Sequence, residues 1–192
     1  MHVNLLLSAL KKPRMNVQIN VILRLQTIFF NMKFVSETDI DRAIDDLEKF
    51  SDEQYEQKMT VFSEMQPVLF TWLFGEQFDL LTEDEQGYLQ YLALIAWMAN
   101  EKVNGPVEAV SEEQIGEAEE RNYEILEMSQ AQNFRARLDP FFQDTTQEDL
   151  LAFAEEAVME EENQEEPLVT AAGREHIFVA LKTLTDVLTR VH

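Results

Sequence analysis

One helix-start signal recurs at five places between residues 36 and 149 of the sequence. In each case a Ser or Thr is followed three residues later by Asp, Glu or Gln, and the signals begin at Ser36, Ser51, Thr82, Ser111 and Thr146. The first hydroxyl can accept from the unpaired backbone N–H groups of a new helix, and the last side chain can reach back to the first residue. The chain has only five Gly and five Pro, which leaves few turns for a many-stranded sheet. We therefore predict an all-α fold.

The apolar spacing between these signals predicts about six or seven helices in one compact bundle. The predicted starts are residues 36, 51, 67, 82, 111, 146 and 167, and Pro67 and Pro167 suit the first turn of a helix. The helix from Ser111 is expected to continue to near Pro140. Both helices within about 67–100 are apolar on most sides, which is typical of buried elements. Acidic residues interrupt this stretch near its middle, so a buried hydrophobic hairpin is favoured over a membrane-spanning one.

The distribution of charge divides the chain just before residue 37. The first 36 residues hold five basic and no acidic side chains, so the other 156 carry a net charge of −27. Support for an organellar transit peptide is thin, and the apolar runs are too short or interrupted for a secretory signal or a membrane helix. We expect translation to start at Met32, with residues 1–31 an extension, and a genuine amphipathic N-terminal helix is the alternative. Residues 32–192 then form a single domain with an acidic connection at about 160–166.

The residues that most catalytic and metal sites require are missing or badly spaced. The chain has no Cys, which excludes disulfides and thiolate metal sites. None of its histidines (His2, His176 and His192) follows a Glu by three residues, as a di-iron carboxylate bundle requires. The five Gly are isolated and form no phosphate-binding loop. We therefore predict no catalytic residue, no metal site, no cofactor and no enzymatic activity.

The net charge of −22 indicates which partners the chain favours. It arises from 37 acidic and 15 basic residues. Such a surface repels nucleic-acid phosphates and anionic lipids and speeds encounter with basic proteins, although it also keeps a protein soluble. We expect no direct binding of nucleic acid or membrane. The lack of Cys fits a reducing cytoplasm, which is the expected location.

Five glutamates in the helix predicted from Ser111 form the candidate binding site. Their 4-3-4-3 spacing places them on one helix face over about 20 Å, and we name them the glutamate ridge: Glu113, Glu117, Glu120, Glu124 and Glu127. A solvated helix face has the same pattern. The leading hypothesis is a non-enzymatic, acidic helical module that binds a basic protein partner through this ridge.

A second hypothesis is a helical pocket for an apolar small molecule. Its lining would come from Phe, Trp and Met side chains of residues 67–100, since 13 Phe and eight Met are available in the chain. The sequence leaves the oligomeric state open.

Overall fold

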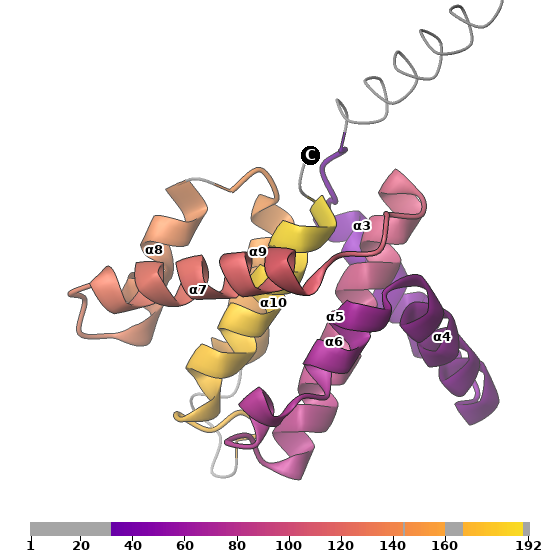
Figure 1. The fold of residues 1–192 in the computed structure, drawn as a ribbon, viewed down its shortest axis with the longest axis horizontal. Coiled ribbons are helices and arrows are strands. Elements are labelled where there is room, and N and C mark those ends of the chain that lie inside the picture. The colour runs from indigo at the N-terminus through magenta and orange to yellow at the C-terminus, as the bar shows by residue number, and fades with distance from the viewer. Residues whose placement is uncertain (1–31, 144, 160–166, 190–192) are drawn as a thin grey trace, which may run out of the picture. The chain divides into compact units, whose positions relative to one another are not determined.

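The computed structural model describes residues 32–143, 145–159 and 167–189. Within these ranges it contains eight α-helices, one 3-10 helix and no strand (Figure 1). The elements are α3 (Glu37–Leu47), α4 (Asp52–Met65), α5 (Pro67–Leu73), η1 (Glu76–Phe78), α6 (Glu83–Asn104), α7 (Glu112–Met128), α8 (Phe134–Gln143), α9 (Glu148–Met159) and α10 (Gly173–Thr189). The predicted all-α bundle is thus confirmed. The predicted extension at 1–31 and the acidic connection at 160–166 lie outside the described residues.

Four of the five predicted helix starts are capped as the sequence indicates. Reciprocal capping boxes begin at Ser36, Ser51, Thr82 and Ser111. The fifth start differs, because α9 begins at Glu148, two residues beyond the expected cap. There the Asp149 carboxylate accepts a hydrogen bond from the backbone N–H of Glu37 at 2.8 Å. This bond joins the start of α9 to the start of α3.

Two predicted helices have different bounds in the structure. The helix expected from Ser111 to near Pro140 is divided into α7 and α8, because Ser129 adopts an extended backbone and ends α7. Pro140 lies inside α8 rather than at its end. The last helix begins at Gly173 rather than near Pro167, since the backbone carbonyl of Thr170 accepts the first turn's N–H bonds.

The core is centred on α6 and α10. Helix α10 is buried at every residue from Ile177 to Thr185 and packs against α6, α7 and α9 (Figure 1). Helix α6 is buried from Leu92 to Trp97 and also packs against α3 and α4. The structure buries three polar residues of α10, Lys182, Thr183 and Thr185, along with its apolar ones. Helix α7 lies on α10 and also contacts α5 and α8.

Residues 67–78 of the predicted hairpin are buried less evenly than α6. Leu69, Leu73 and Phe78 enter the core, while Val68 and Phe74 remain exposed. Phe62 of α4 joins the two parts, because its ring stacks on Trp97 of α6 at a centroid distance of 4.8 Å and meets Phe70 of α5 edge-on at 5.8 Å. Short α5 therefore lies at the margin of the core, with one side open to solvent.

A buried carboxylate joins the starts of α6 and α10. Glu85 is 1% exposed, and its Oε2 accepts the backbone N–H of Thr82 at 2.8 Å. Its Oε1 accepts both the backbone N–H and the hydroxyl of Thr170, each at 2.8 Å. The Thr170 hydroxyl oxygen in turn accepts the backbone N–H of Gly173 at 3.0 Å. We name this arrangement the Glu85 clasp.

The Glu85 clasp changes the acidity of its carboxyl group. Burial raises the pKa of Glu85, but the hydrogen bonds from Thr82 and Thr170 outweigh it and hold the pKa below its ordinary value. The clasp also requires a glycine at 173, because a Cβ there would lie 2.1 Å from Oε1 of Glu85. Hydrogen bonds, rather than a neighbouring cation, thus stabilise the ionised carboxylate.

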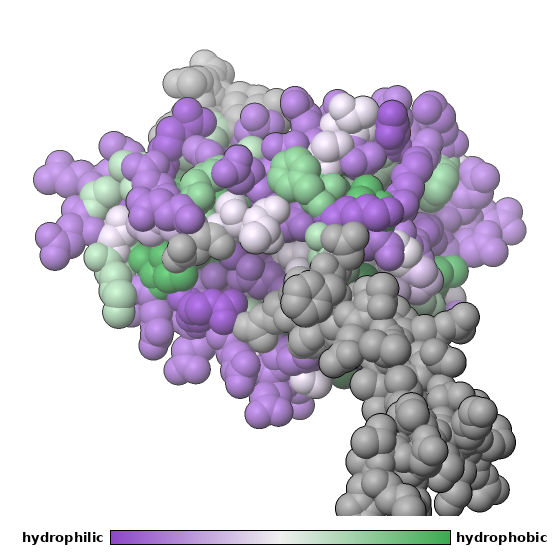
Figure 2. Space-filling view, turned by 90° about the horizontal axis from the view of Figure 1, so that it is seen from above, coloured by the Kyte–Doolittle hydropathy of each residue, from purple (hydrophilic) through white to green (hydrophobic). Residues whose placement is uncertain are grey.

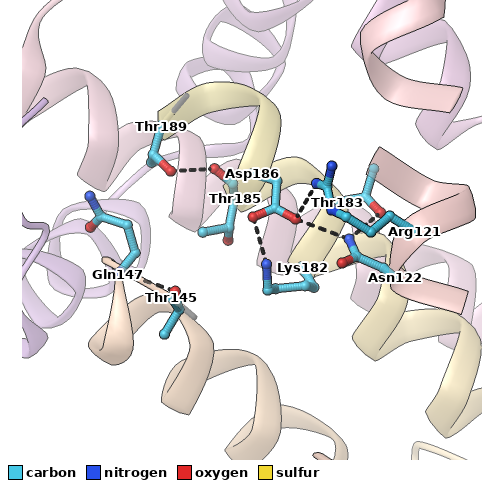
Figure 3. A network of polar contacts seen from close by, with 9 residues as sticks. All are labelled: Arg121, Asn122, Thr145, Gln147, Lys182, Thr183, Thr185, Asp186 and Thr189. Carbon is cyan, nitrogen blue, oxygen red and sulfur yellow. Dashed lines mark hydrogen bonds and ion pairs between the residues drawn. The ribbon is translucent and has the colours of Figure 1, made fainter. Parts of the chain in front are cut away.

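A buried polar network fixes α7 against α10 (Figure 3). Asp186 of α10 accepts from the Lys182 amine at 2.5 Å through one oxygen and from the Asn122 amide at 3.1 Å through the other. Asn122 also donates to the hydroxyl of Thr183 at 3.1 Å and is fully buried. Pairing of this kind lowers the cost of polar groups inside a core, although the buried Oδ1 of Asn122 has no hydrogen-bond partner among the described residues. Because Asn122 points inward, the opposite face of α7 must point to solvent.

Candidate partner-binding surface

Helix α7 presents two opposite faces. The inner face buries Ile115, Ala118, Asn122 and Leu126. The five members of the glutamate ridge are all exposed, as the spacing predicted. The ridge thus lies on a helix whose orientation is set by its buried side.

Arg121 is the cation closest in sequence to the middle of the ridge. Its Nη2 lies 3.4 Å from Oδ2 of Asp186, so the guanidinium is directed toward α10 (Figure 3). Like charges three and four residues apart on a helix repel one another by a few tenths of a kcal/mol per pair. A cationic partner would relieve this repulsion.

A third face of α7 lies between the ridge and the buried side. It carries Glu112, Gly116, Glu119 and Tyr123, which follow a 4-3-4 spacing. The first two are exposed, and Glu119 and Tyr123 are partly buried. We name this face the α7 flank. It faces α5, with which α7 is in contact.

A cavity of about 650 Å³ opens between the α7 flank and α5. The α5 side contributes Val68, Thr71 and Trp72, and the α7 side contributes Ile115, Gly116 and Glu119. Volumes in this range are typical of sites that take a small ligand or a large side chain. We name it the α5–α7 cavity. Its walls combine apolar side chains with a few polar groups.

Trp72 and Glu119 supply the polar groups of the cavity. The indole Nε1 of Trp72 is buried and has no hydrogen-bond partner among the described residues. Burial raises the pKa of the Glu119 carboxyl, and the interaction with the Trp72 indole opposes part of that rise. The cavity therefore contains an acid whose charge is poorly compensated next to a donor that is not fully used.

Below the cavity, Tyr123 holds a short polar chain together. Its hydroxyl lies 2.9 Å from Nδ1 of His176, and Glu175 beside that histidine pairs with Arg137 of α8. Burial, followed by the negative charges of Glu119 and Glu175, raises the pKa of Tyr123 to about 12. Tyr123 is therefore neutral at ordinary pH. The arrangement joins α7, α8 and α10.

Sequence reasoning identified the ridge but missed the flank and the cavity. Glu119 and Gly116 lie within the same helix as the ridge, and their 4-3-4 spacing with Glu112 was an available signal. Trp72 falls in the stretch predicted to be buried, and in the structure it packs against the core and also lines the cavity. No local pattern places Trp72 opposite Glu119, since that depends on how α5 meets α7.

The α5–α7 cavity does not lie between the two helices of residues 67–100, where an apolar pocket was predicted. The cavity uses residues of α5, but its other wall is α7 with two carboxylates, Glu112 and Glu119. Trp97 of α6 is instead 3% exposed and stacked on Phe62. A cavity edged with acids suits a cation better than an apolar molecule.

Hydrophilic side chains predominate in Figure 2, and hydrophobic ones form small, separate groups between them. Among the helices described, none is long and apolar enough to cross a membrane. No group of three or more His, Asp or Glu within the described ranges is arranged to hold a metal ion.

Comparison with protein-family models, curated proteins and solved structures found no significant match to this chain. What the surface can bind is therefore inferred from its own side chains.

Proposed function

We propose that this protein is a cytoplasmic, non-enzymatic interaction module that binds a basic segment of a partner protein along α7. The observation that carries the proposal is the glutamate ridge, which is exposed along its whole length on a helix fixed from behind by Asn122. The ridge extends over about 20 Å at the α-helical rise. An extended segment of about six residues covers that distance.

The chemistry of the ridge favours attraction and fast encounter more than tight binding. Exposed ion pairs contribute about 0–1 kcal/mol each, because water and salt screen them. Several such pairs along one helix add affinity, and the field of a chain with net charge −22 raises the rate of association. Binding through the ridge must therefore weaken strongly as salt is added.

A labelled peptide of alternating Lys and Gly, about eight residues long, tests the proposal. Its binding is measured by fluorescence anisotropy at about 50 mM and about 300 mM NaCl. The ridge variant carries Glu117→Gln, Glu120→Gln and Glu124→Gln. The matched control carries Glu53→Gln, Glu56→Gln and Glu64→Gln on α4, three exposed positions whose replacement changes the net charge equally.

Loss of binding in the ridge variant and its retention in the α4 variant would support the ridge as the binding site. Equal weakening in both variants would mean that the peptide responds to net charge alone, and the proposal would be wrong. Affinity that is the same at both salt concentrations would also contradict it, because exposed charge pairs are screened.

A further inference from the structure

We infer that the α5–α7 cavity is an anchor for a single arginine side chain of the basic partner, held between Trp72 and Glu119. This inference rests on the proposed function and adds a specific contact to it. The ridge attracts any cationic segment, whereas the cavity selects one residue of that segment.

Guanidinium chemistry matches the Glu119 carboxylate and the aromatic ring of Trp72, whereas the indole N–H is itself a donor and takes no part in this match. A carboxylate accepts paired N–H bonds from the planar guanidinium, and an indole ring attracts a cation placed over its face. Arginine can make both contacts at once, and lysine presents only a point charge on a strongly hydrated amine. Glu119 and Trp72 both line the cavity, one from each helix.

The remaining walls suit the aliphatic part of the same side chain. Val68 and Ile115 are apolar lining residues on opposite sides of the cavity. Long cationic side chains bury their methylene groups along such surfaces while the charged end meets a polar partner. Val68 is 37% exposed, so this apolar surface is open to a partner.

Gly116 provides the space on the α7 side. A Cβ built at this position would meet nothing within 4 Å, so the cavity extends up to the helix backbone. A glycine in a helix interior costs about 0.5–1 kcal/mol relative to alanine. The fold does not require Gly116 for its conformation, and a larger side chain there would occupy the cavity without disturbing the core.

Charge explains why a cation rather than a neutral group is the occupant. Glu119 is partly buried beside Tyr123, which stays neutral, and the nearest flank acid is Glu112. An incompletely solvated carboxylate gains more from a cation than an exposed one does, because the local dielectric constant is lower. The two carboxylates that line the cavity, Glu112 and Glu119, also raise the local concentration of cations.

The cavity is tested separately from the ridge with n-butylguanidinium, a probe too small to span the ridge. The chain has two Trp, and the ¹⁵N-labelled indole signal of Trp72 is assigned with Trp72→Phe, leaving that of buried Trp97 as an internal reference. The blocking variant is Gly116→Leu. Its matched control is Gly87→Leu, at another exposed helical glycine whose Cβ would also meet nothing within 4 Å.

We expect n-butylguanidinium to shift the Trp72 signal in the wild type and in Gly87→Leu, but not in Gly116→Leu. Glu119→Gln should lower the affinity for n-butylguanidinium about five- to tenfold, because the charged hydrogen bonds are lost. An Arg–Gly peptide should bind the wild type more tightly than the Lys–Gly peptide, and Gly116→Leu should abolish that difference. Circular dichroism melting confirms that each variant is folded.

Absence of any Trp72 shift, or an equal shift in the two glycine variants, would overturn the anchor. Equal affinity of the Arg–Gly and Lys–Gly peptides would overturn it as well. Neither result tests the ridge as a binding site, because binding of the Lys–Gly peptide to the wild type and to the ridge variant decides that separately. If the Lys–Gly peptide does not bind but n-butylguanidinium clearly shifts the Trp72 signal, the cavity remains a cation site and the ridge is refuted as a binding site.

Discussion

Replacing Glu85 by alanine should destabilise the protein more than any other single change at an acidic residue described above. The side chain accepts three hydrogen bonds, one from Thr82 and two from Thr170, and is 1% exposed. Alanine leaves all three donors without an acceptor in a place that water reaches poorly. Buried donors that lose their acceptor cost their full desolvation free energy.

The size of the effect follows from these three bonds. Loss of the capping interaction at Thr82 costs about 1 kcal/mol. Each hydrogen bond from Thr170 to a charged acceptor contributes about 1.5 kcal/mol or more. Glu85→Ala should therefore lower the free energy of unfolding by about 4 kcal/mol, a large part of the about 5–15 kcal/mol that stabilises a domain.

Glu85→Gln separates the two parts of the clasp. Glutamine serves in the capping boxes of α4 and α7, as Gln54 and Gln114, so it can retain the bond to Thr82. Its amide group would then meet the donors of Thr170. We expect a loss of about 2 kcal/mol, half that of alanine.

Urea unfolding followed by circular dichroism measures both changes. With a slope of about 2 kcal/mol per M, Glu85→Ala should lower the midpoint by about 2 M. Glu83→Ala, at an exposed position in the same first turn, is the control and should change stability by less than about 0.5 kcal/mol. An effect of Glu85→Ala no larger than that of the control would refute the clasp as a stabilising element.

The clasp also predicts a dependence on pH with a defined sign. The pKa of Glu85 is lowered in the folded protein. Its contribution to the free energy of unfolding is therefore complete above the unfolded pKa of about 4 and is lost as the pH falls through the folded pKa. The difference between wild type and Glu85→Gln should therefore be large at neutral pH and shrink in acid. A difference that grows as the pH falls would contradict the assignment.

Three further changes test other parts of the structure, each by urea unfolding. Gly173→Ala should cost about 1–3 kcal/mol, because its Cβ would displace a Glu85 oxygen that Thr170 holds in place. Tyr123→Phe should cost about 1 kcal/mol, since it removes the hydrogen bond to His176. Glu119→Gln should gain stability relative to wild type as the pH rises above about 4, because burial raises the folded pKa and ionisation then disfavours the fold.

Local signals predicted the helix starts and the exposed ridge well. A capping box and a 4-3-4-3 spacing each involve residues within a few turns, so no knowledge of the tertiary structure is needed. The break between α7 and α8 was missed because residues 129–133 contain neither Gly nor Pro. A weaker signal was present at Asn133, whose side chain accepts the backbone N–H of Ala136 at 2.7 Å at the start of α8.

Hydrogen bonds between helices that are distant in the sequence determine which polar residues are buried, and local sequence patterns do not show them. Lys182 and Thr183 are polar by type and were not expected in the core. They are buried because Asp186 and Asn122 satisfy them, and those partners are brought together only by the contact between α7 and α10. The α5–α7 cavity was unpredictable for the same reason, since Trp72 and Glu119 meet only in the folded chain.

The proposed binding function accounts for two features of α7 that do not favour its stability. Gly116 lowers the helix propensity by about 0.5–1 kcal/mol relative to alanine, although no close neighbour requires it. The glutamate ridge adds repulsion between neighbours, while Arg121 is directed to Asp186. Solubility alone would be served as well by mixed charges, and a helix selected only for stability would carry alanine at 116. Gly116 lines the α5–α7 cavity. Under the proposed function both features would become favourable, because a cationic segment along α7 would offset the repulsion within the ridge and place one side chain in the space that Gly116 leaves.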